Sequence, residues 1–287
     1  MIKIEYCFIV ALLCLIGLYA CSSNTETTEN EVVNELPWHK DAVMYELNVR
    51  QFSPEGTFQA VLPQLQRIKD LGVDILWLMP IHPIGVENRK GELGSYYSIS
   101  NYTEINPKFG TKDDFKMLVD EAHKVGMKII LDLVANHTAW DHPWVKTYPE
   151  WYVADSLGNR PTVPNDPHGN PTDWTDVAGL DYSNAAMRVA MIEDMKYWIA
   201  EFDVDGYRCD VAGHIPVDFW QDARLALDSI KPVFMLAEHE HEDYHDNAFH
   251  ATYGWEFHHY LNKIAQGEKK LNSLVEYMDK ELKRFPN

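Results

Sequence analysis

The chain has 287 residues and a formal net charge of −19, with 46% hydrophobic and 12% aromatic residues. This length is sufficient for a large hydrophobic core in one or two domains. The negative charge argues against nucleic acid as a partner, because phosphate binding needs a basic surface. A neutral substrate, or simply an acidic and soluble surface, accounts equally well for the charge.

Residues 1–20 have the features of a bacterial signal peptide. Lys3 precedes an apolar run of about fifteen residues, which is short for a membrane span. The run ends in Ala20-Cys21, which resembles the site where a bacterial lipoprotein is cleaved and lipidated. We expect Cys21 to anchor the protein to a membrane of the bacterial cell envelope, facing the periplasm or the exterior. Plain secretion is the alternative.

Cysteine usage agrees with this organisation. Two of the four cysteines would leave with the signal peptide and Cys21 would carry lipid, so Cys209 would be the one free thiol. Residues 21–36 are rich in Ser, Thr, Asn and Glu, which predicts a solvated tether. The folded domain is then expected at residues 37–287.

Apolar, strand-like runs alternate with helical patterns along this domain. Strands are expected at 42–52, 73–79, 127–134, 204–210, 233–238 and, with a weaker pattern, 249–257. Helices are expected at 57–71, 112–125, 185–202, 217–229 and 271–283. The alternation predicts an α/β fold in which helices cover a parallel sheet.

The expected architecture is a TIM (β/α)8 barrel that is truncated after about six strands, since a closed barrel needs eight. Residues 138–180, which follow the third strand, are too many for a plain loop and are rich in aromatic side chains. They predict a small inserted subdomain.

Two carboxylates end consecutive predicted strands, Asp210 and Glu238. Neighbouring strands lie about 4.8 Å apart, and a retaining glycosidase holds its two carboxylates about 5 to 5.5 Å apart. Arg208 precedes Asp210 by two residues, so both side chains point to the same face and the cation would keep Asp210 ionised. Spacing alone leaves a solvated pair of strand-end carboxylates as an equal alternative.

At this point the sequence resembles glycoside hydrolase family 13, the α-amylase family. The resemblance is carried by ordered blocks: Asp132-Leu-Val-Ala-Asn136-His137, Gly206-Tyr-Arg208-Cys-Asp210-Val-Ala-Gly-His214, Leu236-Ala-Glu238-His, and Gly94-Ser-Tyr-Tyr97 with Phe109-Gly-Thr111. It implies that Asp210 is the nucleophile of a double displacement and that Glu238 is the general acid/base. The implied substrates are the α-glucosidic bonds of starch-like glucans or maltodextrins.

The resemblance also implies supporting roles around the carboxylates. Arg208 would orient Asp210, His137 would hydrogen-bond the sugar being cleaved, and Tyr97 would stack beneath its ring. His214 is assigned to substrate binding, and Asn136 is a candidate calcium ligand. We expect no required cofactor and leave bound calcium open.

Two departures from the family pattern stand out. Gly179 occupies a position where calcium-binding members carry an acidic ligand, and calcium needs six to eight oxygens. The family's fourth block, which carries a third catalytic Asp, does not appear before Asn287. We therefore expect Asp210 and Glu238 to be two members of a trio, and an inactive fragment is one alternative.

Two further alternatives remain. His241-Glu242-Asp243-Tyr244-His245 matches the HExxH pattern of zinc proteases, but that motif needs both histidines on one helix face and here it directly follows a predicted strand. A non-catalytic carbohydrate-binding lipoprotein would keep the aromatic residues and the anchor without turnover.

Overall fold

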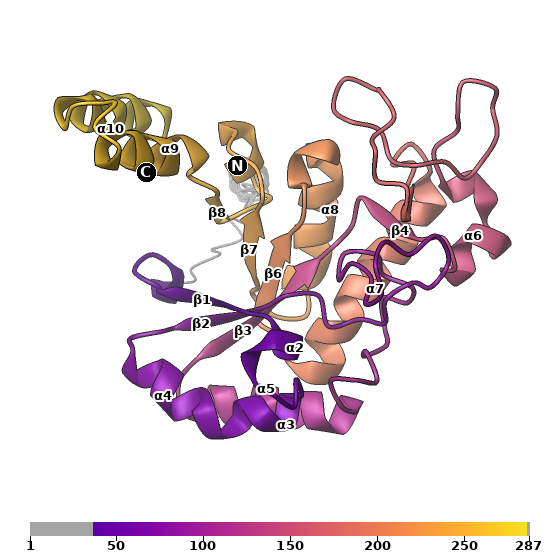
Figure 1. Cartoon of the computed structure of the whole chain (residues 1–287), viewed down its shortest axis with the longest axis horizontal. Coiled ribbons are helices and arrows are strands. Elements are labelled where there is room, and N and C mark those ends of the chain that lie inside the picture. Colours follow the sequence, from indigo (N-terminus) through magenta and orange to yellow (C-terminus); the bar gives the residue numbers. More distant parts are fainter. Residues whose placement is uncertain (1–36, 286–287) are drawn as a thin grey trace, which may run out of the picture. The chain divides into compact units, whose positions relative to one another are not determined.

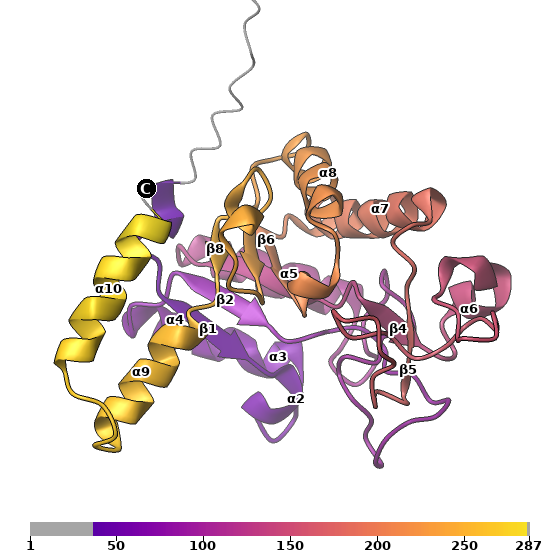
Figure 2. The same cartoon turned by 90° about the horizontal axis from the view of Figure 1, so that it is seen from above.

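The computed structural model describes residues 37–285, and a parallel sheet of six strands lies at their centre (Figure 1). In spatial order the strands are β1 (Met44–Leu47), β2 (Ile75–Leu78), β3 (Lys128–Leu133), β6 (Gly206–Cys209), β7 (Phe234–Ala237) and β8 (Ala251–Thr252). The sheet curls into half of a barrel (Figures 1 and 2). The expectation of a partial (β/α) barrel with six strands is confirmed. The expected signal peptide and tether, at residues 1–36, lie outside the described residues.

Helices follow the strands along the chain. They are α2 (Val49–Phe52), α3 (Phe58–Val61), α4 (Leu65–Asp70), α5 (Lys112–Lys124), α6 (Pro143–Thr147), α7 (Ala185–Phe202), α8 (Val217–Asp228), α9 (Trp255–Ala265) and α10 (Asn272–Arg284). Short 3₁₀ turns are η1 (Pro37–His39), η2 (Leu62–Gln64), η3 (Pro149–Trp151), η4 (Ala212–His214) and η5 (Glu242–His245). No helix within residues 37–285 is both long and apolar enough to cross a membrane.

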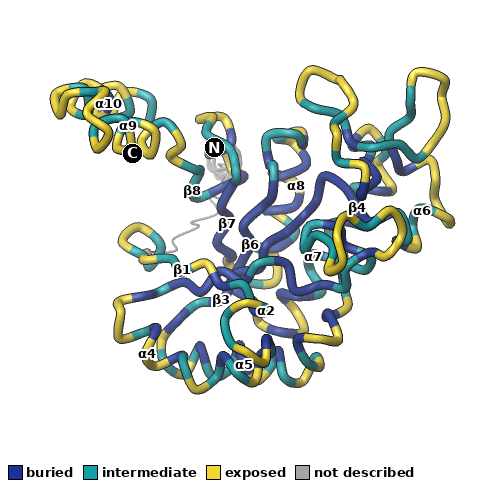
Figure 3. Tube along the Cα trace, in the orientation of Figure 1, coloured by how far each residue is buried: buried dark blue, intermediate teal, exposed yellow. Residues whose placement is uncertain are grey.

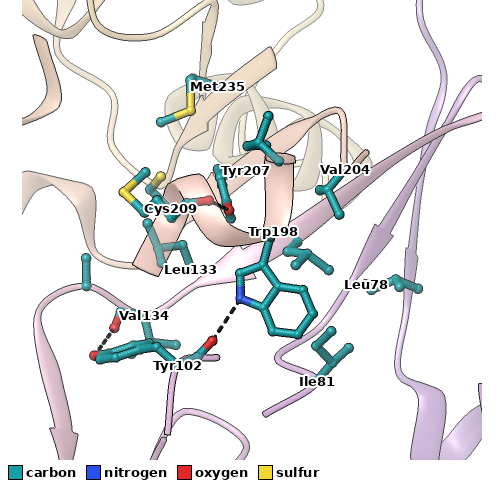
Figure 4. Packing of buried hydrophobic residues seen from close by; sticks show 14 of the residues in the cluster. Leu78, Ile81, Tyr102, Leu133, Val134, Trp198, Val204, Tyr207, Cys209 and Met235 are labelled. Carbon is teal, nitrogen blue, oxygen red and sulfur yellow. Dashed lines mark hydrogen bonds between the residues drawn. The ribbon is translucent and has the colours of Figure 1, made fainter. Parts of the chain in front are cut away.

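Side chains alternate between the two faces of the sheet, as the geometry of a strand requires. One set packs with the helices and includes Leu78, Tyr207 and Met235, which belong to the same buried cluster as Trp198 of α7 (Figure 4). The other set faces the concave side, where Trp77 and Leu236 form a smaller cluster. Asp132 and Arg208 occupy concave positions, so the alternation places polar groups inside the half-barrel.

Three expected elements differ from the structure. The expected strand 42–52 ends at Leu47, and its second half is the helical turn α2. The expected helix 57–71 is divided by η2, because Pro63 has no N–H for the α-helical ladder. The weak strand 249–257 shrinks to the two residues of β8.

The insert after β3 contains short strands that no apolar run in the sequence predicts. β4 (His137–Ala139) and β5 (Val177–Gly179) form an antiparallel pair. The loops between them are largely exposed at the margin of the fold, in contrast to the buried strands (Figure 3). The pair places His137 and the residues before Val177 next to the C-terminal ends of the central strands.

Candidate active site

The site is built where β3, β6 and β7 end. Asp132 and Arg208 are direct neighbours in the register of β3 and β6. Asp210 follows Arg208 by two residues and therefore projects to the same face. Glu238 follows the last residue of β7, and its N–H donates to Cys209 O at 3.0 Å. Neighbouring strand ends thus bring the charged groups together, as expected for this end of a barrel.

Arg208 is the centre of the site, since one buried guanidinium serves three carboxylates. Its Nη1 lies 2.8 Å from Asp132 Oδ1 and 2.9 Å from Asp210 Oδ1. Its Nη2 lies 2.9 Å from Glu238 Oε2. Its Nε donates to the Tyr253 hydroxyl at 3.0 Å. One cation among three carboxylates leaves the cluster with excess negative charge.

Burial sets the protonation of the two aspartates. It raises the pKa of Asp210 to about 6; Arg208 opposes this rise, and the charge of Glu238 adds to it. Burial likewise raises the pKa of Asp132 to about 7, against the effect of Arg208. Asp210 is therefore ionised above about pH 6, as a nucleophile must be, while Asp132 stays partly protonated near neutrality.

Asp132 has further donors on its second oxygen. The Tyr97 hydroxyl donates to Oδ2 at 3.2 Å, and the Trp77 indole N–H donates to it at 3.3 Å. Tyr97 is thereby fixed beside the cluster, although it comes from the long loop after β2. A flat ring held in this way can pack against the apolar face of a sugar.

A cavity of about 540 Å³ opens above these groups. It is lined by Lys90, Gly94, Ser95, Tyr97, His137, Trp174, Asp176, Val177, Asp210, Val211 and Glu238. Burial lowers the pKa of His137 to about 4, so its imidazole is neutral and can both donate and accept a hydrogen bond. The cavity has the size of a small-molecule site and presents mixed polar and aromatic groups, as sugar binding requires.

The structure brings Asp210, Glu238, Tyr97 and His137 to this cavity, with Arg208 behind them. Two other predicted site residues lie differently. The ring of His214 is parallel to that of Trp174, with centroids 5.9 Å apart, and does not line the cavity. Asn136 is buried, and its Nδ2 lies 3.2 Å from His137 Nδ1. The roles assigned to all these residues stay predictions.

Several side chains at the site could not be identified from the sequence pattern. Trp77 lies inside an apolar run that reads as core, and Tyr253 follows a strand of two residues, so neither has a local signal. Lys90, Trp174 and Asp176 come from two loops that meet at the cavity. The Lys90 ammonium lies 2.9 Å from Asp173 O and 3.4 Å from Asp176 Oδ1.

The candidate metal motifs do not assemble into a metal site in the described part of the chain. The HExxH segment forms η5 rather than an α-helix, with His241 paired to Asp243 and His245 next to Thr252. Between residues 37 and 285, no group of three or more His, Cys, Asp or Glu side chains is arranged to hold a metal ion.

Gly179 occupies the position of an acidic calcium ligand in the family pattern, so its surroundings test whether such a ligand would fit. A Cβ at this position would lie 2.5 Å from Pro164 Cα, so the backbone leaves no room for an acidic side chain. Asn136, the other candidate ligand, directs its Nδ2 to His137 Nδ1, and this contact leaves its amide oxygen unused. Position 179 therefore cannot supply the acidic ligand that the family resemblance suggests, and Asn136 would offer one of the six to eight oxygens that calcium needs.

Two carboxylates that face one cavity at the C-terminal strand ends of a partial (β/α) barrel are the arrangement expected in the class of glycoside hydrolases. The model of the α-amylase catalytic domain matches residues 22–284, and the chain belongs to this family. Alpha-amylase 3 of Dictyoglomus thermophilum is 33% identical over 230 residues, covering 70% of this chain and 44% of the relative. An oligo-1,6-glucosidase of Bacillus sp. is 33% identical over 214 residues, covering 63% of this chain and 40% of the relative.

Solved structures agree with this assignment. The maltogenic α-amylase AmyB of Thermotoga neapolitana is 40% identical with a TM-score of 0.77, over 86% of this chain and 57% of that one. An α-amylase of Lactobacillus plantarum is 39% identical with a TM-score of 0.76, over 84% of this chain and 59% of that one. The chain thus spans about half the length of the relatives it matches.

Proposed function

We propose that the chain is the catalytic part of a retaining glycoside hydrolase that cleaves α-glucosidic bonds in starch-like glucans or maltodextrins. The observation that carries the proposal is that Asp210 and Glu238 open into one cavity and share the guanidinium of Arg208. Family membership supports it, as do the names of the relatives, an α-amylase and an oligo-1,6-glucosidase.

The proposed reaction has two displacements. Asp210 attacks the anomeric carbon while the glycosidic C–O bond breaks and the Glu238 proton passes to the leaving oxygen. A covalent glycosyl ester forms on Asp210. Glu238, now a carboxylate, removes a proton from water, which displaces Asp210 and restores the α configuration.

The surrounding groups fit this chemistry. Arg208 favours the ionised form of Asp210, and Tyr97 is held in place by its bond to Asp132. A neutral His137 can hydrogen-bond a sugar hydroxyl. Because the ring is uncharged, it does not repel the positive charge that develops on the sugar in the transition state. The mechanism uses these side chains and no metal ion.

We also propose that Cys21 is lipidated and holds the protein at the bacterial cell envelope. The proposal rests on the apolar run that ends in Ala20-Cys21 and on the polar residues that follow. Metabolic labelling with a fatty acid should mark the wild-type protein and fail to mark Cys21→Ala. Equal labelling of both would overturn the anchor.

The hydrolysis itself is tested by following maltoheptaose cleavage by NMR with the full chain. We expect the α anomer of the new reducing end to appear first, and Asp210→Asn to lower the rate by at least about 10⁴-fold. Asp120→Asn, which changes an exposed carboxylate on α5, is the matched control and should keep the rate. A first product in the β form would exclude retention, and binding without cleavage would favour the carbohydrate-binding alternative.

A further inference from the structure

Val211, the residue after Asp210, has a backbone conformation that a β-branched residue rarely adopts. Its φ is 38° and its ψ is 45°, in the left-handed region. Strain of this kind persists only where the surrounding structure enforces it, and it concentrates at functional sites. The left-handed residue lies two positions after the end of β6 and directly precedes η4.

The turn aims a hydrogen-bond donor at Glu238. The Val211 N–H donates to Glu238 Oε2 at 2.7 Å, and Arg208 Nη2 lies 2.9 Å from the same oxygen. With two donors on Oε2, the proton of the acid form belongs on Oε1. The Val211 amide therefore fixes both the direction of the carboxyl group and the oxygen that can donate.

Buried side chains hold this turn from behind. The Tyr244 hydroxyl lies 3.0 Å from Ile215 O and 3.3 Å from Ala212 O, and the Trp220 indole N–H donates to Ala212 O at 3.2 Å. Burial raises the pKa of Tyr244 to about 12, so its hydroxyl remains a donor. The carbonyl of the first residue of η4 and that of the residue after it are thus fixed by groups from α8 and η5.

The segment that supplies Tyr244 is the one that matches the zinc-protease pattern. The rings of His239 and Tyr244 lie 4.5 Å apart, so these two side chains pack against each other as well as against the turn. A Cβ on Gly213 would lie 2.4 Å from His239 Nδ1, so a side chain there would push the segment away. The segment is therefore packed against the catalytic turn through Tyr244 and His239.

We propose that Tyr244 is a positioning residue for the acid/base: it holds Val211 in its left-handed conformation, and the Val211 N–H then orients Glu238. The role of Glu238 as acid/base rests on the proposed function, whereas the hydrogen bonds that hold it do not. Nothing in the proposal requires Tyr244 to touch the substrate.

The first test compares substrates that differ in their need for an acid. Tyr244→Phe removes only the hydroxyl, and kcat/KM for maltoheptaose should fall by about 10- to 100-fold, part of what a general acid contributes. A maltosyl fluoride, whose leaving group needs little protonation, should keep its kcat/KM within about threefold. Equal losses on both substrates would show a merely structural role and overturn the proposal.

Two variants complete this test. Tyr207→Phe removes a buried hydroxyl that donates to Met195 O at 2.6 Å, away from the site, and should alter neither substrate. Val211→Gly in the Tyr244→Phe background should restore the maltoheptaose rate, because glycine adopts the left-handed conformation without strain. Failure of this rescue would contradict the role assigned to the Val211 turn.

The second test does not depend on turnover. Amide hydrogen exchange should show the Val211 N–H protected in the wild type and exchanging about tenfold faster in Tyr244→Phe, but not in Tyr207→Phe. Unchanged exchange would overturn the positioning role. If the wild type cleaves neither substrate, the proposed function fails, and this measurement alone decides the role of Tyr244.

Discussion

Two groups of charged side chains lie at opposite ends of β6, and their balance of charge is opposite. Before the strand, Asp205 accepts the Ile129 N–H at 2.9 Å and lies 3.0 Å from Lys128 Nζ and 2.6 Å from His123 Nε2. After the strand, the Arg208 guanidinium is shared by three carboxylates. Asp205 and Asp210 are both buried, so the two aspartates differ in their partners rather than in their own exposure.

The partners decide how each aspartate behaves. The pKa of Asp205 is lowered: burial opposes this, but the bonds to His123 and the Ile129 N–H outweigh it. The pKa of Asp210 is instead raised to about 6 by burial. Perturbed carboxyls of the second kind are typical of functional sites, and in barrels the chemistry lies at the C-terminal ends of the strands. We infer that the Asp205 group stabilises the fold, whereas the ionised carboxylates around Arg208 lower the stability of the folded state and serve the reaction.

The largest contrast is expected in the free energy of unfolding. Asp205→Asn leaves Lys128 without its charged partner and weakens the bonds to His123 and the Ile129 N–H, so it should lower this free energy by about 3 kcal/mol. Asp210→Asn relieves repulsion among the carboxylates and should leave it unchanged or raise it by about 1 kcal/mol. Urea unfolding of both variants measures the difference, with Asp120→Asn as the control. Equal destabilisation by the two variants would contradict the distinction.

The pH dependence of stability should have opposite signs in the two groups. Asp132 and Asp210 have folded pKa values of about 7 and about 6, above the unfolded value near 4. They stabilise most below pH 4, and this contribution is lost as the pH rises through those folded values. Asp205 has a lowered folded pKa, so it stabilises the folded state above its unfolded pKa. This contribution is lost as the pH falls through the folded pKa of Asp205.

Urea unfolding at a series of pH values tests these signs. Between about pH 4 and pH 7 the free energy of unfolding should decline by on the order of 5 kcal/mol on account of Asp132 and Asp210. Asp210→Asn should flatten part of this decline, and Asp205→Asn should leave it in place. A decline that survives Asp210→Asn unchanged would show that the raised pKa is not a property of the folded site.

The smallest effect is expected for Lys231→Met. Lys231 is partly exposed and pairs more closely with Asp203 than with Asp205, whose Oδ1 lies 3.5 Å from its Nζ, while Lys128 and His123 remain close to Asp205. Its removal should lower the free energy of unfolding by less than about 1 kcal/mol. A loss as large as that of Asp205→Asn, measured by the same urea titration, would show that Asp205 depends on Lys231 rather than on several partners together.

The sequence predicts some of these features because they follow from short-range geometry. Residues two apart on a strand share a face, so Arg208 and Asp210 were expected to meet, and they do. Parallel strands with continuous apolar runs were also readable, because burial on both faces leaves an unbroken pattern. The helix predicted at 185–202 is confirmed with these limits, and the structure adds that the Asn184 side chain caps its start.

Other features depend on tertiary contacts that leave no local pattern. The strand pair β4 and β5 has three residues on each side and is held by the fold around it. The left-handed Val211 carries a side chain that favours extended backbone, so only its neighbours can explain it. Asp205 precedes a strand as a single polar residue, and its partners come from α5, β3 and a distant turn.

The central claim is that Asp210 becomes covalently bonded to the sugar, and trapping that intermediate tests it most directly. A slow fluorinated α-glucosyl fluoride should inactivate the protein and add one sugar mass to the peptide that contains Asp210, as found by mass spectrometry after digestion. Asp210→Asn should show no labelled peptide. A label on a different carboxylate, or rapid turnover with no label on the wild type, would contradict the claim.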